Sequence, residues 1–178
     1  MSLEIRQTLP GDVAAAELVL NDGKAALAEL SIPQWMGEYP NRVDIEADMA
    51  EGASYVAVGK DGTVLAVMAL SFSGEDTYDA IDGSWLTTSD SRDPRYAVIH
   101  RCAIGASAAR QGIMTKMFLM GEDVAREHGM ESVRVDTHER NIRVRGLVEK
   151  LGYTRCGTIA LPYEDEVDPL RIAFEKVL

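Results

Sequence analysis

The sequence predicts an α/β protein in which helices cover a single mixed β-sheet. Its length of 178 residues suits one domain, spanning residues 1–178, that buries a core without disulfides or metals. The hydrophobic pattern switches repeatedly between the strand period of two residues and the helical period of about 3.6 residues. These observations predict the element order β-α-α-β-β-β-α-β-α-β-β, with the central β-α-β-α run carrying the chemistry.

The first part of the chain is expected to supply a strand, two helices and a hairpin. Apolar and polar residues alternate in the strand, and an Ala- and Leu-rich stretch has helical spacing before it stops at Pro33. Asn41 can cap the second helix, and Lys60-Asp61-Gly62 supplies the hairpin turn. The expected elements are a strand at 3–8, helices at 12–30 and 43–51, and strands at 54–59 and 63–71.

Residues 74–95 differ from the rest because they are polar and acidic and contain Gly83 and Pro94. Two isolated aromatic residues, Tyr78 and Trp85, stand among these polar neighbours. Such a composition is typical of an excursion over the surface.

The last part of the chain returns to regular elements. Gly129 and Gly152 close two amphipathic helices, the second of which Asn141 can cap. The turn-prone stretch from Pro162 to Pro169 separates the final strands. The expected elements are strands at 96–104, 132–138, 153–161 and 170–177, and helices at 112–128 and 141–151.

Charge and composition exclude several classes of function. The formal net charge of −11 argues against nucleic-acid binding, which needs a basic surface. No stretch reaches the roughly 18 apolar residues of a membrane helix, and the N-terminus lacks a signal-peptide pattern, so we expect a cytoplasmic protein. The two cysteines, Cys102 and Cys156, have no metal-ligand spacing, so we expect free thiols and no metal.

The charge is distributed unevenly along the chain. Residues 101–155 hold ten Lys or Arg against seven Asp or Glu, a net charge of +3, which leaves −14 for the remainder. One segment therefore suits an anion and the rest a cation, unless the asymmetry is ordinary solvated surface charge.

A phosphate-binding turn is predicted where the strand at 96–104 runs into the helix at 112–128. The amides at a helix start have no intrahelical partner and lie at the positive end of the helix dipole. Small side chains between Ile104 and Gly112 let a ligand approach this backbone, and Arg110 and Lys116 add positive charge.

Three motifs resemble the GNAT acetyltransferase superfamily. They are Ala109-Arg110-Gln111-Gly112-Ile113-Met114, Val133-Arg134-Val135-Asp136-Thr137-His138-Glu139-Arg140-Asn141 and Leu147-Val148-Glu149-Lys150-Leu151-Gly152-Tyr153. The first departs from the family pattern, because the basic residue is displaced to Arg110 and the closing small residue is Met114. The resemblance covers residues 96–161 by motif and the rest by topology. Words such as Pro33-Gln34-Trp35 and Val98-Ile99-His100-Arg101 also resemble a bacterial subgroup whose acceptor substrate is unassigned.

The resemblance implies the acyl-CoA N-acyltransferase fold, with acetyl-CoA as cosubstrate between splayed fourth and fifth strands. The backbone of Cys102, Ala103 and Ile104 would bind the pantetheine arm, and the amide of Ile104 would stabilise the oxyanion. Asn141 would meet the pantetheine, beside its role as a helix cap. The pyrophosphate would lie on the amides of Arg110, Gln111, Gly112, Ile113, Met114 and Thr115.

His100 is the leading candidate for the general base. Strand alternation would place it on the same face as Cys102 and Ile104, and the ordinary pKa of a histidine lies near working pH. A half-buried structural histidine is the alternative, and Glu139 and His138 are second choices for the base.

The other groups point to direct acetyl transfer. The usual Tyr that protonates the departing thiolate is replaced by Val148, and Tyr153 is expected to pack in the core. Cys102 on its strand is expected to be a small buried apolar residue, because strand cysteines seldom act as nucleophiles.

The acceptor is expected to be a small cationic amine. Four aromatic residues are assigned to its site, namely Trp35, Tyr39, Tyr78 and Trp85, with core packing as an alternative for Trp35. Two other functions stay open: acetylation of a protein N-terminus or lysine, and a catalytically silent acyl-CoA sensor. A homodimer is possible.

Overall fold

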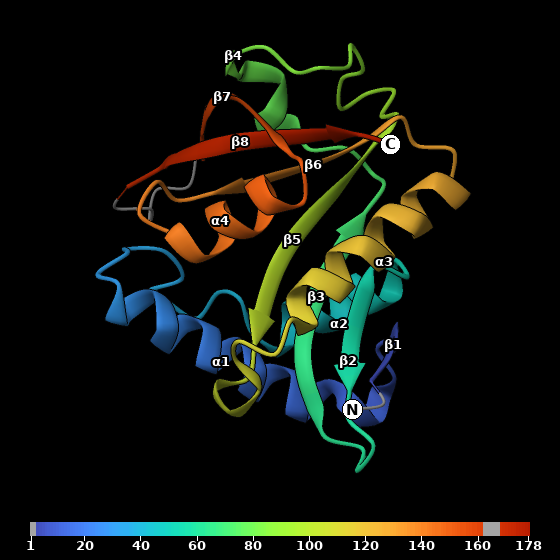
Figure 1. Ribbon diagram of the computed structural model, residues 1–178, viewed down its shortest axis with the longest axis vertical. Helices are drawn as coiled ribbons and strands as arrows, with labels where there is room; N and C mark the ends of the chain where they lie inside the picture. Colours follow the sequence, from blue (N-terminus) through green and yellow to red (C-terminus); the bar gives the residue numbers. More distant parts are fainter. Residues whose placement is uncertain (1–2, 162–167) are drawn as a thin grey trace.

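The computed structural model describes residues 3–161 and 168–178, so most of the turn predicted from Pro162 to Pro169 lies outside the described residues. It confirms the mixed α/β class: the described strands form one sheet in the order β1-β2-β3-β5-β6-β8-β7-β4 (Figure 1). The strands are β1 (Glu4–Gln7), β2 (Ser54–Val58), β3 (Val64–Ser71), β4 (Asp82–Gly83), β5 (Tyr96–Ile104), β6 (Ser132–Thr137), β7 (Thr154–Ala160) and β8 (Leu170–Val177).

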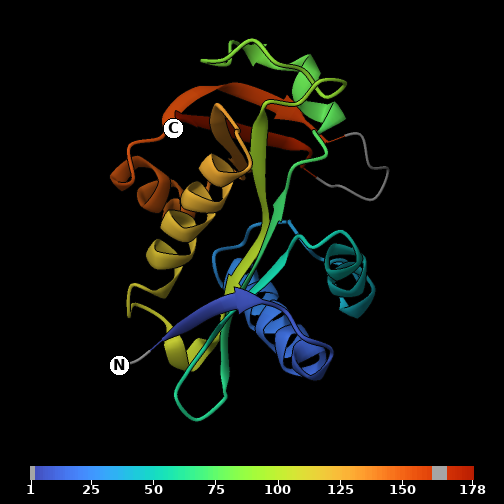
Figure 2. The same cartoon turned by 90° about the vertical axis from the view of Figure 1, so that its right-hand side faces the viewer.

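Four α-helices cover the two faces of the sheet. They are α1 (Val13–Glu29), α2 (Arg42–Ala50), α3 (Ile113–Glu127) and α4 (Ile142–Lys150). One core cluster joins α1 and α2 to the sheet, and a larger one joins α3 and α4 to its other face. Figure 2 shows the two pairs on opposite sides of β5. None of the described helices is both long and apolar enough to cross a bilayer.

Helix starts follow the predicted capping chemistry. The Asn41 side chain accepts from the amide of Val43 at 2.7 Å, and the Asp44 carboxylate accepts from the amide of Asn41 at 2.8 Å. This reciprocal box explains why α2 begins at Arg42. Asn141 caps α4 in the same way, by accepting from the amide of Val144 at 3.3 Å.

The central parallel pair, β5 and β6, is joined at one end only. The pairing runs from Tyr96 opposite Ser132 to Val98 opposite Arg134 and then stops. Beyond that point β5 remains paired with β3, and β6 with β8. The two strands therefore diverge, as the resemblance implied, and open a gap in the sheet (Figure 1).

A bulge in β5 corrects one expectation. Ala103 pairs with Val67 and His100 with Ala69, so Arg101 and Cys102 together face a single β3 residue. Arg101 has φ 45°, a left-handed conformation that fits an extra residue in the strand. Before the bulge, Ala97 and Ile99 join the core cluster under α3 and α4, whereas after it Cys102 and Ile104 pack there. His100 consequently faces the opposite side from Cys102 and Ile104, and the predicted shared face is wrong.

The segment 74–95 is more than the expected surface excursion. It contains a 3-10 turn (Asp76–Ala80) and the two-residue strand β4, neither of which was predicted. Gly83 in β4 pairs with Gly157 in β7 so closely that a Cβ on Gly83 would overlap the carbonyl oxygen of Cys156. Tyr78 is fully buried, so the segment contributes to the core.

Candidate active site

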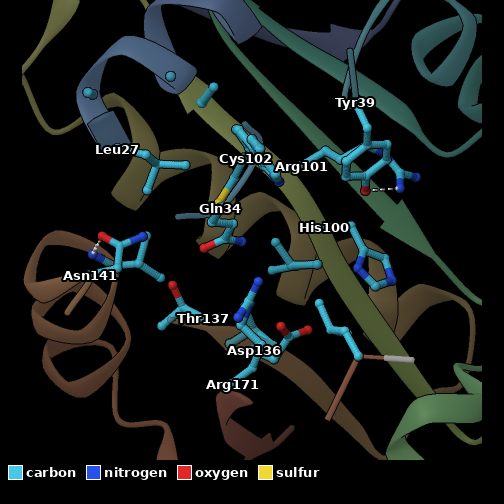
Figure 3. Close-up of a pocket in the computed structure, with 18 of the residues that line it drawn as sticks. Leu27, Gln34, Tyr39, His100, Arg101, Cys102, Asp136, Thr137, Asn141 and Arg171 are labelled. Atoms are coloured by element: carbon cyan, nitrogen blue, oxygen red, sulfur yellow. Dashed lines mark hydrogen bonds between the residues drawn. The ribbon is translucent and has the colours of Figure 1, made fainter. Parts of the chain in front are cut away.

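A cavity of about 1080 Å³ occupies the gap between the diverging strands. Its walls include Cys102 and Ile104 on β5, and Val135 and Thr137 on β6. The loop between α1 and α2 forms another wall through residues 33–39. Figure 3 shows Gln34, Cys102 and Thr137, from elements far apart in the sequence, around one space.

At the α3 end of the cavity, several backbone amides have no hydrogen-bond acceptor among the described residues and could bind an anion. Within the described part of the chain, no acceptor is bound by the amides of residues 110–115. The first intrahelical bond that closes the start of α3 comes from Lys116 to the carbonyl oxygen of Gly112. Gly112 has φ 74°, with open space where a Cβ would lie. Met114 lines the cavity, and Arg110 and Lys116 are exposed beside it.

The open edge of β5 offers a further donor to the cavity. The amide of Gly105 binds the carbonyl oxygen of Leu65 on the β3 side at 2.8 Å. Because successive amides of a strand point to opposite edges, the amide of Ile104 faces the gap. Asn141, 8% exposed, lines the same gap.

His100 lines the same cavity, beside Glu75. Its Nε2 is 3.6 Å from Glu75 Oε2, and 20% of its side-chain surface is exposed. Burial, with a smaller contribution from the Arg101 cation, lowers the pKa of His100 to about 3. The ring is therefore neutral at working pH, and its pKa lies well below the ordinary histidine value that the sequence suggested.

Asp136 is a cavity residue that the sequence did not single out. It lies on β6 and accepts a hydrogen bond from the Tyr78 hydroxyl at 2.7 Å. Burial raises its pKa, against the lowering effects of that bond and of Arg171. A charged residue within a strand of otherwise buried residues was the available signal, but it was used only as part of a family motif.

Arg101 joins three elements around the mouth of the cavity. Its guanidinium binds the Asp48 carboxylate on α2 with two nitrogens and the Tyr39 hydroxyl with a third, the last at 3.1 Å. The bulge thus aims a cation out of β5 toward α2, where an anion meets it. Tyr39 is 47% exposed and lines the cavity, and its role in substrate binding stays a prediction.

Trp35 lines the cavity and also packs against the core cluster under α1. Core packing of Trp35 is thus confirmed, and its assignment to the acceptor site stays a prediction. A glycine in α1 makes the arrangement possible, because a Cβ on Gly23 would lie 2.9 Å from the Ala103 Cβ and 3.3 Å from the Trp35 ring.

Tyr78 and Trp85, assigned to the acceptor site from the sequence, do not line this cavity. Trp85 donates to the Tyr78 carbonyl oxygen at 2.9 Å, and the two rings lie 5.0 Å apart. The guanidinium of Arg134 stacks 4.3 Å from the Trp85 ring and 3.8 Å from the Tyr96 ring. Their cation-π partner is therefore a residue of the protein, and the two aromatics hold the segment 74–95 in place.

The second choices for a base also lie elsewhere. Glu139 is exposed and outside the cavity lining. His138 is 3% exposed, with Nε2 2.9 Å from Asp168 and Nδ1 accepting from the amide of Arg140. Both ring nitrogens of His138 are engaged. Neither His138 nor Glu139 lines the cavity.

Tyr153 is buried as predicted, whereas Cys102 is only partly buried against the core. Val148 is fully buried, and Tyr153 is 5% exposed against Phe118. Burial raises the pKa of the Cys102 thiol to about 11, so this cysteine stays protonated at neutral pH. No group of three or more described His, Cys, Asp or Glu residues is arranged to hold a metal ion.

The sequence and the fold both match a family of known proteins. A sequence model of the acetyltransferase (GNAT) family matches residues 24–153. A GNAT-family acetyltransferase of Streptococcus agalactiae is 31% identical over 99% of this chain and 95% of its own, with a TM-score of 0.84. No curated protein sequence matches.

Two further solved structures share the fold at low identity. A GNAT-family acetyltransferase of Listeria monocytogenes is 16% identical over 99% of this chain and 95% of its own, with a TM-score of 0.73. The ribosomal-protein-S18-alanine N-acetyltransferase of Escherichia coli is 13% identical over 99% and 94%, with a TM-score of 0.67.

Proposed function

The chain belongs to the GNAT acetyltransferase family, and from this premise we propose that it moves the acetyl group of acetyl-CoA to a primary amine of a small cationic molecule. The observation that carries the proposal is the single cavity between β5 and β6. It extends from Met114, in the first turn of α3, to His100 and Glu75. We call the part of the cavity next to Met114 the coenzyme arm and the part next to His100 and Glu75 the acceptor arm. A donor in the first and an acceptor in the second would meet at the open edge of β5.

The coenzyme arm suits acetyl-CoA. The amides of residues 110–115 would receive the pyrophosphate, with Arg110 and Lys116 adding charge attraction. The pantetheine would run along Cys102, Ala103 and Ile104, the stretch of β5 that β6 leaves unpaired. Asn141 would face this arm from the start of α4.

The acceptor arm suits a cation. Besides Asp48, which pairs with Arg101, four acidic residues line the cavity, namely Glu38, Glu51, Glu75 and Asp136. The one cation that β5 directs there, Arg101, is already neutralised by Asp48. Trp35 and Tyr39 supply aromatic surface for the body of the amine.

The chemistry is a direct attack with balanced proton movement. The acceptor ammonium loses its first proton to water, and neutral His100 is placed to take the second proton of the nitrogen during the attack, with the Glu75 carboxylate stabilising the imidazolium that forms. The amine lone pair then attacks the thioester carbonyl, whose oxygen takes negative charge and binds the amide of Ile104. The intermediate collapses with cleavage of the C–S bond, and the CoA thiolate takes a proton from water, because Val148 offers none.

Thiol release from acetyl-CoA tests this function. Spermidine, glucosamine, lysine and an alanine tripeptide are offered at a series of concentrations, and the small polyamine is expected to react best. A preference for the tripeptide would favour the protein acetyltransferase alternative. CoA binding without release for any amine would favour the silent sensor.

The general base is tested separately. We expect His100→Ala to lower the turnover rate near neutral pH and to leave the Kd for CoA unchanged, because His100 lies in the acceptor arm. An unchanged rate would remove His100 from the mechanism. The remaining assignments are that the whole chain acts as one cytoplasmic domain without a metal, and that it can form a homodimer.

A further inference from the structure

Gln34 presents a buried oxygen to the cavity. It belongs to the loop between α1 and α2, and its Oε1 has no solvent exposure and no hydrogen-bond partner among the described residues. Figure 3 shows its amide extending into the space bordered by Cys102, Thr137 and Asp136. Buried polar atoms are nearly always paired in folded proteins, so this oxygen implies a donor that arrives with a ligand.

The loop that carries Gln34 is held in place at both ends. Ile32 is 3% exposed, and Trp35 packs against the core next to α1. Lys24 donates to the carbonyl oxygens of Gly37 and Glu38 at 3.2 and 2.7 Å. Gln34 is thus presented by a fixed backbone, as a recognition residue requires.

The reacting amine is the donor that fits this oxygen. At the moment of attack the amine is neutral, with N–H groups to satisfy and a lone pair that must stay free. Glu75 and Asp136 attract the incoming ammonium, but a carboxylate also stabilises its charged, unreactive form. A neutral carboxamide oxygen accepts an N–H without favouring the ammonium to the same degree.

We propose that Gln34 Oε1 accepts an N–H of the acceptor amine and holds it, deprotonated, for attack on the thioester. The inference rests on the proposed function and makes Gln34 a specificity-determining residue for primary and secondary amines. Amines without an N–H could not use this contact. The alternative donor is an amide of the pantetheine arm, and the experiment separates the two.

Two variants of similar size to Gln34 test the proposal, with spermidine as the acceptor probe. Gln34→Met removes the oxygen and is expected to raise the KM for spermidine about tenfold, with the Kd for CoA unchanged. Gln34→Glu adds a charge, so it is expected to lower that KM and to move the acid limb of the pH–rate profile up by about one pH unit. A purely structural role would not shift the profile.

The matched control is Gln7→Glu, the same substitution at an exposed position on β1 outside the cavity. It is expected to leave both KM and the pH profile at wild-type values. Thermal unfolding of each variant establishes that the compared proteins are folded.

The outcomes separate the two levels of argument. Wild-type turnover with unchanged KM and pH profile in both Gln34 variants overturns the role of Gln34 and leaves acetyl transfer standing. A weakened Kd for CoA in Gln34→Met assigns the oxygen to the pantetheine and also overturns it. Absence of thiol release by the wild type with every amine overturns the proposed function, and the role of Gln34 with it.

Discussion

Among the described residues, polar groups are unpaired at the start of α3 but paired in a buried cluster formed by Arg134, Glu175, Ser132 and Thr87. At the start of α3, the amides of residues 110–115 bind no acceptor in the described protein. In the cluster, Arg134 and Glu175 are 1% and 0% exposed, and each binds several partners. Glu175 accepts from Ser132 at 2.6 Å, from Arg134 at 3.0 Å and from Thr87 at 2.6 Å. We therefore expect a ligand at the unpaired amides and a purely structural role for the buried network.

The largest expected effect is in the buried cluster. Arg134→Met would leave Glu175 buried without its cation, which should lower the free energy of unfolding by about 3–5 kcal/mol. Urea denaturation followed by circular dichroism measures the loss. Arg95→Met is the control, because the Arg95–Glu131 pair, at 2.7 Å, is about half exposed and should cost less than about 1 kcal/mol. Equal losses in the two variants would break the comparison.

The lowered pKa of His100 predicts how the stability of the protein depends on pH. Its folded pKa is about 3, whereas the unfolded chain has about 6.5. Between these values the unfolded state binds the extra proton, so the free energy of unfolding falls as the pH is lowered, by up to about 1.4 kcal/mol per pH unit. His100→Gln should remove this slope between pH 6.5 and 4, as urea titrations at several pH values would record. Asp136, whose raised pKa acts with the opposite sign, is present in both proteins.

A pair of glycines isolates the role of the α3 start. Gly112 and Gly129 bound the same helix, have φ 74° and 72°, and leave open space for a Cβ. Alanine at either position should cost about 1 kcal/mol of stability through backbone strain. Gly112→Ala alone should also weaken CoA binding, about tenfold by calorimetry, because its Cβ would stand against the pyrophosphate. An equal Kd in the two variants would remove the amides from the coenzyme site.

The smallest expected effect is that of salt. Raising the ionic strength from about 0.05 to 0.5 M should weaken CoA binding about threefold, because Arg110 and Lys116 are exposed. The stability lost in Arg134→Met should stay nearly the same, since buried pairs are screened little. A salt-independent Kd would indicate that backbone amides carry the coenzyme site without these side chains.

The sequence predicted what depends on local pattern. Helical periodicity and the capping residues Asn41 and Asn141 located α2 and α4 to within a residue or two. Gly112 and the small residues before it located the start of α3, a site made of backbone whose position follows from the strand-to-helix transition. The family resemblance placed the divergence of β5 and β6.

The remaining errors have long-range causes. One inserted residue at Arg101 reversed the facing predicted for His100, and no periodicity shows an isolated bulge. Trp85 stood among polar neighbours in the sequence, but its partner Arg134 lies on β6. Desolvation by the surrounding fold, which composition does not describe, lowered the pKa of His100.

The bulge in β5 has a consequence for how relatives of this protein could diverge. Before it, the His100 side chain faces the proposed acceptor, whereas after it Cys102 and Ile104 face the core layer beneath the proposed coenzyme site. Because different residues of β5 would contact the acceptor amine and acetyl-CoA, mutations could change the preferred amine without altering how the thioester binds. A screen randomising His100 and Gln34 together would explore new acceptors on an unaltered donor scaffold.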